Sequence, residues 1–187
     1  MATARRLAIS IAAKDRPGIV AEVAGLIAEW NGNLADLRET VLDGYFTMIL
    51  MAELPADHAP EELERHLTAR TGARVAVMPC ETPSPAPPDL ADTYVLSASG
   101  PDRTGLVAQV AAFCRDRAVN ILDFASRTAD GRYLMTLLVD LSRTAGPEAL
   151  RPELDRLAEG GGLHLGLRHY DVFRATNEIQ KPLADKP

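Results

Sequence analysis

Two short segments of this 187-residue chain combine the residue types that a small charged ligand would need. Asp15-Arg16-Pro17-Gly18 precedes one apolar helical pattern, and Asp102-Arg103-Thr104-Gly105 precedes another. A helix N-terminus offers unpaired backbone N–H groups and the positive end of the helix dipole, which suits a carboxylate. A glycine there lets a ligand or a neighbouring backbone approach closely. Both segments are therefore candidate binding turns.

A second group of polar residues follows each helical pattern. Asn33 and Asn120 each supply an amide donor and acceptor, and Asp36 and Asp123 supply carboxylates that could face an ammonium group. A site for a carboxylate and a site for an ammonium together describe a free amino acid. Each residue type also has a structural interpretation, with Asp as a helix N-cap, Arg as a solvated or ion-paired surface group and Asn as a left-handed turn residue.

The two segments belong to an internal duplication. Asp15 and Asp102 are separated by 102 − 15 = 87 positions, and the same offset aligns residues 10–67 with residues 97–154 without a gap. A single register over this length predicts two copies of one module.

Prolines concentrate between the two copies, which predicts a semi-rigid extended linker. We therefore expect a first domain at residues 1–80, a Pro-rich linker at 81–91, a second domain at 92–174 and a polar tail at 175–187.

Hydrophobic periodicity predicts the element order β-α-β-β-α-β in each copy. In the first copy the expected elements are a strand near 7–11, a helix over 17–30, strands over 34–42 and 45–53, a helix over 60–71 and a strand over 74–78. In the second copy they are a strand over 94–99, a helix over 105–117, strands over 121–128 and 132–141, a helix over 147–159 and a strand over 163–173. Asp43-Gly44 and Asp130-Gly131 are hairpin signals. The predicted fold class is α+β: two ferredoxin-like domains, each a four-stranded antiparallel sheet with two helices on one face.

The D-R-P-G-[I/L]-V turn, its helix, and G-N-L or V-N-I leading into the second strand resemble the ACT domain. The resemblance covers about residues 5–80 and 92–174. The tandem arrangement is similar to the double-ACT proteins of the glycine cleavage system transcriptional repressor family. ACT domains characteristically bind small ligands, often amino acids, where two such domains pack together.

The resemblance implies ligand-lining residues in both copies. Those of the first copy are Asp15, Arg16, Pro17, Gly18, Ile19, Asn33 and Leu34, and those of the second are Asp102, Arg103, Gly105, Leu106, Asn120 and Ile121. Asp36, Asp123 and Thr104 complete the candidate set. Thr104 stands where the first copy has Pro17, which frees the loop and adds a hydroxyl, so the two sites need not be equivalent.

Composition and motifs argue against several other functions. The net charge of −6 argues against a broad electrostatic grip on nucleic acid. No apolar run is long enough for a membrane span. Two cysteines make neither a disulfide framework nor a zinc site, which suggests a reducing, cytoplasmic compartment. Catalytic motifs, metal-ligand spacings and cofactor fingerprints are absent from the sequence, so we expect no enzyme activity, metal or cofactor.

Four histidines and one cysteine carry more specific expectations. His58 and His66 are expected at a solvated surface, and His164 and His169 on opposite faces of the last strand. Cys114 aligns with Ile27 of the first copy, so we expect it to be buried.

The sequence thus predicts a non-catalytic regulator that binds an amino acid such as glycine or serine and modulates a partner protein, such as a transcription factor. The alternatives are a ligand-independent oligomerisation or interaction module and a detached regulatory subunit of a metabolic enzyme. We expect either a homo-oligomer or pairing of the two domains within one chain, without direct binding to nucleic acid or membrane.

Overall fold

The computed structural model describes residues 4–80, 89–129 and 131–178. The chain divides into two compact units, Met1–Pro85 and Ala86–Pro187, which we call module 1 and module 2. The boundary falls within the predicted linker at 81–91, of which residues 81–88 lie outside the described residues. The described end of the linker leads into a short 3₁₀ turn, η1 (Leu90–Asp92), where Asp89 accepts the Ala91 N–H at 3.0 Å.

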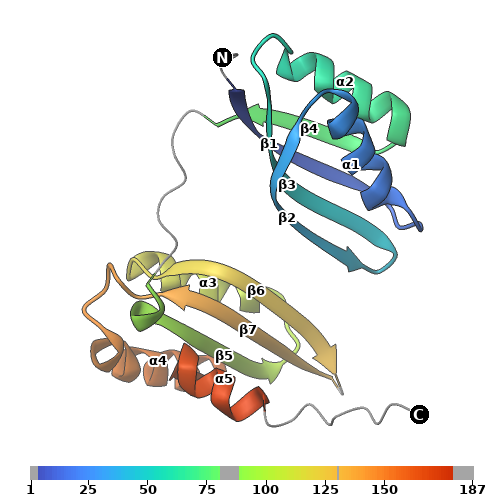
Figure 1. Ribbon diagram of the computed structural model, residues 1–187. Coiled ribbons are helices and arrows are strands. Elements are labelled where there is room, and N and C mark those ends of the chain that lie inside the picture. The colour runs from blue at the N-terminus through green and yellow to red at the C-terminus, as the bar shows by residue number, and fades with distance from the viewer. Residues whose placement is uncertain (1–3, 81–88, 130, 179–187) are drawn as a thin grey trace, which may run out of the picture. The chain divides into compact units, whose positions relative to one another are not determined.

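Module 1 is a four-stranded antiparallel sheet with the strand order β2-β3-β1-β4 (Figure 1). Its elements are β1 (Ala4–Lys14), α1 (Ile19–Glu29), β2 (Asn33–Leu42), β3 (Tyr45–Pro55), α2 (Pro60–Thr71) and β4 (Arg74–Pro79). Side chains along β3 alternate, so that Phe46, Met48 and Leu50 are buried on the face that α1 and α2 cover. The opposite face of the sheet, which the helices leave uncovered, is called the open face below.

Module 2 repeats this arrangement with the strand order β6-β7-β5-β8. Its elements are β5 (Thr93–Pro101), α3 (Leu106–Asp116), β6 (Asn120–Ala129), β7 (Arg132–Asp140), α4 (Pro147–Gly161) and β8 (His164–His169). Met135, Leu137 and Val139 on β7 are buried beneath α3 and α4, as their counterparts are in module 1 (Figure 1). Two βαββαβ modules with both helices on one face of an antiparallel sheet confirm the predicted fold class.

The tight turn between β2 and β3 explains why the strands pair in this register. Asp43 and Gly44 both have positive φ, at 51° and 75°, as a two-residue type I′ hairpin requires. The equivalent Gly131 has φ of 71°, while Asp130 lies outside the described residues. The hairpin prediction is thus confirmed in module 1, where both turn residues are described.

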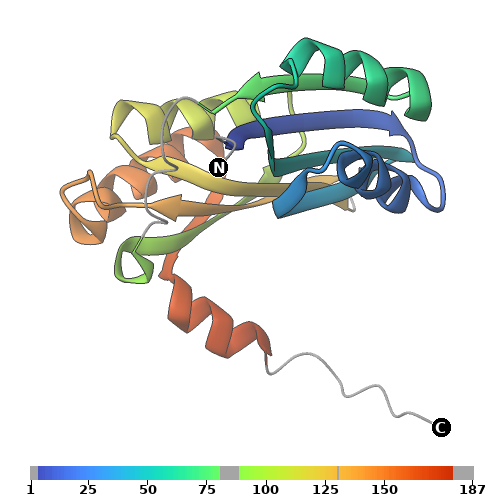
Figure 2. The same cartoon turned by 45° about the horizontal axis from the view of Figure 1, so that its top comes forward.

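The end of module 2 differs from the sequence prediction. A strand over 163–173 is wrong, because β8 ends at His169 and a helix, α5 (Tyr170–Glu178), follows it directly. Figure 2 shows α5, in red, continuing from the end of β8. The His169 Nδ1 accepts the Asp171 N–H at 3.2 Å and so partners one of the unpaired donors in the first turn of α5.

The β-forming side chains Tyr170, Val172 and Phe173 misled the prediction. The helix also includes the first four residues of the predicted polar tail at 175–187, of which residues 179–187 lie outside the described residues. No helix in the described parts of the chain is long and apolar enough to cross a membrane.

Candidate functional site

The turn before the first helix has the same backbone geometry in both modules. Gly18 and Gly105 are the N-cap residues of α1 and α3, each with φ of 87° in the left-handed region, and neither helix has a side-chain cap. Asp15 and Asp102 therefore do not act as N-caps. Pro17 lies in the turn itself, and the helix begins two residues later, at Ile19. An uncapped helix start leaves N–H donors available to an anion.

The arginine of each turn folds back over the helix that follows. Arg16 forms an ion pair with Glu22 and donates to the Thr71 carbonyl at the end of α2 (3.4 Å). Arg103 donates to the Gln109 side chain at 2.6 Å. These contacts give the arginines a structural role in both modules, although the exposed position of Arg16 makes its ion pair worth little.

A shallow hollow of about 430 Å³ lies at the turn of module 2. Four predicted residues line it, Asp102, Arg103, Gly105 and Leu106, together with Val107, Ala108 and Tyr133. Sequence reasoning missed Tyr133. The hairpin register would have indicated it, because its neighbour Arg132 pairs with Pro101 immediately before the turn.

Asn33 and Asn120 are exposed at the start of β2 and β6, each followed by a half-buried apolar residue, Leu34 or Ile121. A β-bulge interrupts the strand in both modules just after this position. Asp36 Oδ1 accepts the Leu37 N–H at 2.8 Å, and Asp123 accepts the equivalent N–H of Phe124. The repeated aspartates therefore have a local role in the bulge.

The two predicted clusters lie at opposite ends of the sheet within one module. The turn adjoins Tyr45, the partner of Lys14 at the end of β1, whereas Asn33 pairs with Glu53 at the far end of β3. At about 3.3 Å per residue, this separation is roughly 26 Å. A single amino acid cannot touch both clusters of one module, so a site that uses both requires two modules.

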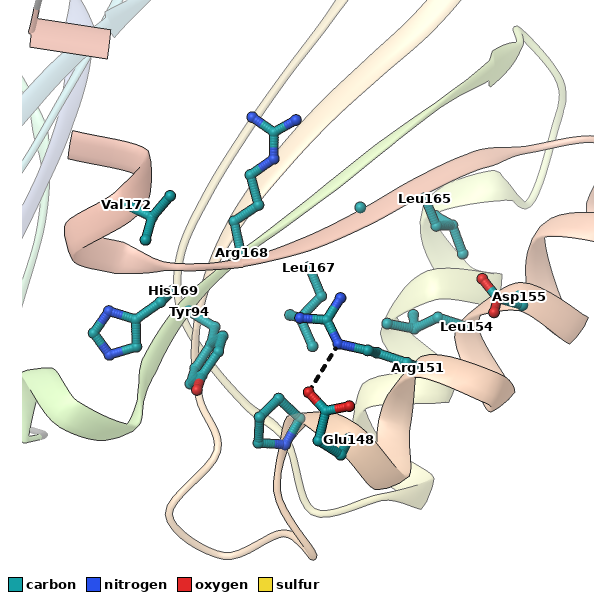
Figure 3. Close-up of a pocket in the computed structure, with 12 residues that line it drawn as sticks. Tyr94, Glu148, Arg151, Leu154, Asp155, Leu165, Leu167, Arg168, His169 and Val172 are labelled. Carbon is teal, nitrogen blue, oxygen red and sulfur yellow. Dashed lines mark hydrogen bonds and ion pairs between the residues drawn. The ribbon is translucent and has the colours of Figure 1, made fainter. Parts of the chain in front are cut away.

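A further hollow of about 600 Å³ lies between α4 and β8 (Figure 3). Leu154 of α4 and Leu167 of β8 line it, and Arg151 donates to Glu148 at 3.2 Å at its rim. None of the predicted site residues lines it. Leu154 is 5% exposed, whereas the equivalent Leu67 in module 1 is fully buried. We attribute this hollow to the looser seating of α4.

The predicted positions of the four histidines are confirmed for two of them and wrong for the other two. A solvated surface for His58 and His66 is wrong: both are half-buried and pack on the ring of Trp30, with centroids 4.7 and 5.3 Å away. Helical spacing alone could not show that Trp30, from another element, covers them. His164 and His169 do lie on opposite faces, since they pair with Ser99 and Tyr94, which point to opposite sides of β5.

Cys114 is buried as expected, with 1% of its surface exposed. Burial raises the pKa of its thiol to about 11, and the nearby Arg117 only partly offsets this effect. Such a thiol is a packing residue rather than a nucleophile. The described residues contain no group of three or more His, Cys, Asp or Glu side chains that could hold a metal ion.

Two models of the ACT domain match this chain, one over residues 5–74 and the other over residues 94–159. Together they cover more than half of the sequence, so the chain belongs to the ACT domain family. It carries two such domains in tandem, and each match begins near the start of one observed module.

Two curated relatives illustrate the modular relationship. The chain is 34% identical over 86 residues to the UPF0237 protein MJ1558 of Methanocaldococcus jannaschii, which covers 96% of that protein but 46% of this chain. It is 33% identical over 75 residues to a UPF0237 protein of Methanosarcina acetivorans, covering 82% of that protein and 40% of this chain. These relatives therefore have about the length of one module.

Two solved structures share the tandem fold. An unknown protein from Galdieria sulphuraria has a TM-score of 0.69 and 24% identity, covering 89% of this chain and 98% of that one. A structure described as a "putative glycine cleavage system transcriptional repressor" has a TM-score of 0.68 and 18% identity, covering 88% and 96%. At these identities the likeness concerns the fold alone.

Proposed function

We propose that this protein is a non-catalytic regulator that binds a free amino acid, such as glycine or serine, between ACT modules. The observation that carries this proposal is the uncapped helix start, with the same left-handed glycine and Asp-Arg turn in both modules. The ligand carboxylate would approach the N–H groups of this turn. Its ammonium would approach Asn33 or Asn120 of a second module, because the two clusters of one module are too far apart.

Ligand binding would favour one packing of the modules and thereby change the surface that a partner protein meets. The partner we propose is a transcriptional regulator of amino-acid metabolism in the cytoplasm. The tandem fold shared with the structure described as a "putative glycine cleavage system transcriptional repressor" supports this choice. The net charge of −6 favours action through a protein partner over direct binding to DNA.

Calorimetry with each of the twenty amino acids tests the ligand. We expect saturable binding of glycine or serine that Arg103→Ala and Asn120→Ala each weaken by more than about tenfold. Arg65→Ala, at an exposed position on α2, is the matched control and should bind as the wild type does. If the folded protein binds none of the twenty, the ligand part of the proposal is wrong.

The contacts of Arg16 and the bulge aspartates favour a second candidate, a module that binds a partner without any ligand. A pull-down with and without added amino acids separates the two. Capture of the same partner in equal amounts under both conditions supports the ligand-independent module. If the capture depends on glycine or serine, the sensor is supported. Co-purification with a metabolic enzyme activity would instead identify a detached regulatory subunit.

A further inference from the structure

The open face of the module 2 sheet carries a groove of about 560 Å³. The strand register aligns the residues of this face in rows that run across the sheet. The central row consists of Ala125, Thr136, Ser97 and Gly166, from β6, β7, β5 and β8 in that order. No side chain in this row is larger than threonine, so the row forms a floor between its two flanking rows.

Three basic side chains line this groove from its two ends. Arg127 lies at the β6 end, and His164 and Arg168 lie at the β8 end. Figure 3 shows Arg168 projecting from β8 on the side opposite to the core residue Leu167, as its place on the open face requires. None of the three side chains makes a hydrogen bond or an ion pair with the residues that the structure describes.

Gly166 forms the floor at the β8 end. It lies between His164 and Arg168 along the strand, and a Cβ at this position would come within 3.0 Å of the Ser97 Oγ. The glycine therefore makes room for the Ser97 side chain, and the two basic groups flank this point along β8. Because Arg127 is three strand spacings away from β8, or about 14 Å, the groove is longer than a phosphate ion alone.

The polar lining consists of donors to an anion. The hydroxyls of Ser99 and Thr136 can donate from the margin and the floor, whereas the Ser97 hydroxyl donates to the Gly166 carbonyl at 3.3 Å. No Asp or Glu lines the groove among the described residues. The flanking row does include Asp123, but its Oδ1 accepts the Phe124 N–H at 2.9 Å at the bulge. A guanidinium group can pair with two phosphate oxygens at once, so Arg168 suits a phosphate at the β8 end of the groove.

Module 1 has the same register but different side chains at these positions. Its central row contains Arg38 and Ile49, where module 2 has Ala125 and Thr136, and Ile49 is 50% exposed. Met78 takes the place of Arg168, on the strand next to β1. Large side chains therefore occupy the floor of module 1. At its β4 edge Arg74 stands where module 2 has His164, but Met78 replaces the second cation, Arg168.

We propose that the groove on the open face of module 2 binds a small organic phosphate. The phosphate lies over Gly166 between His164 and Arg168, and the organic part extends along the floor toward Arg127. The residues that line this groove include none of those in the turn or the asparagine cluster, so the site does not depend on the amino-acid site proposed above.

Titration of the full chain with glycerol 3-phosphate and with adenosine monophosphate, at constant ionic strength, tests this site. Amide NMR signals of Ser97, Thr136 and Gly166 should shift in a saturable way, and calorimetry should give the affinity. Thr136→Ile and Arg168→Met each introduce the residue that module 1 has at that position, so both are expected to fold. Each should weaken binding at least tenfold.

Ile49→Thr and Arg38→Ala make comparable changes on the open face of module 1 and should leave the affinity within twofold of wild type. Asn120→Ala, which tests the amino-acid site, should also leave it unchanged. Absence of saturable binding to the folded wild type overturns the proposal, as does an equal loss in Arg38→Ala. Equal or tighter binding of succinate overturns the phosphate assignment.

Discussion

Module 1 and module 2 keep the same strand register but carry different side chains on their open faces. Ile49 fills the middle of the first face, whereas Thr136 leaves the middle of the second face open. At the first turn, by contrast, Gly18 and Gly105 have the same φ of 87°. Both copies thus keep the backbone conformation of the turn, while the side chains on their open faces differ. The two modules have the same backbone framework but present different surfaces.

The bulge shows that repetition alone does not identify a ligand site. Asp36 and Asp123 are repeated as regularly as the glycines, yet each accepts the N–H of the next residue in its own strand. A residue present in both copies can therefore serve the fold, a ligand or both. Substituting equivalent residues in module 1 and module 2, and comparing the effects on stability and binding, separates these roles.

The largest effect is expected in the two cores. Leu50→Ala and Leu137→Ala remove equivalent, fully buried side chains, and each should lower the free energy of unfolding by about 2–5 kcal/mol. Hydrogen exchange should show the lost protection in the altered module. Equal loss in both modules from either substitution would contradict two separately stabilised units. Ile49→Ala, beside Leu50 but half exposed, should cost less than about 1 kcal/mol.

The two turns should respond alike. Gly18→Ala and Gly105→Ala place a Cβ on left-handed backbone with nothing within 4 Å, so the cost is conformational and should be about 1–2 kcal/mol each. Gly25→Ala, within α1 and equally unobstructed, should instead raise stability by about 0.5–1 kcal/mol. Chemical denaturation measures the change in the free energy of unfolding for all three variants. A clearly unequal loss for Gly18→Ala and Gly105→Ala would show that the two turns are not equivalent.

The core of module 2 contains a thiol, Cys114, at the position where the core of module 1 has Ile27. With its pKa raised to about 11 by burial, the Cys114 thiol should react with a thiol reagent at least roughly tenfold more slowly than Cys80. The folded pKa lies above the reference value of 9.0, so this group's contribution to stability is complete below pH 9 and is lost as pH rises through about 11. Cys114→Val should flatten that decline in denaturation experiments at pH 8 to 11. Rapid labelling of Cys114 in the folded protein would contradict its burial.

The smallest effect is expected where α1 and α3 end. Asn31 and Ala118 occupy equivalent left-handed positions, with φ of 53° and 54°. Asn tolerates this conformation better than Ala, so Ala118→Asn should raise the free energy of unfolding by less than about 1 kcal/mol and Asn31→Ala should lower it by a similar amount. Thermal denaturation of both variants checks the signs, and the same sign for both would show that the two helix ends are not equivalent.

The sequence by itself determined the features that depend on neighbours along the chain. The 87-residue offset indicated two modules. Alternation and helical spacing predicted the βαββαβ order of each, with element bounds within a few residues except at the end of module 2, where α5 was missed. Asp43-Gly44 predicted the hairpin because a type I′ turn needs positive φ at both residues. These signals are local, so they can be recognised in the sequence without knowledge of the fold.

Tertiary structure decided which residues meet across the sheet and which remain apart. Strand direction separates the turn from Asn33 by the length of β3, although the two clusters are close in sequence. Trp30 covers His58 and His66 from another element, and His169 accepts the N–H that begins α5, where strand-forming residues predicted a longer strand. The groove over Gly166 exists because register places four small side chains in one row. Register is a non-local property, set by pairing between strands far apart in sequence, and composition or periodicity within one segment does not contain it.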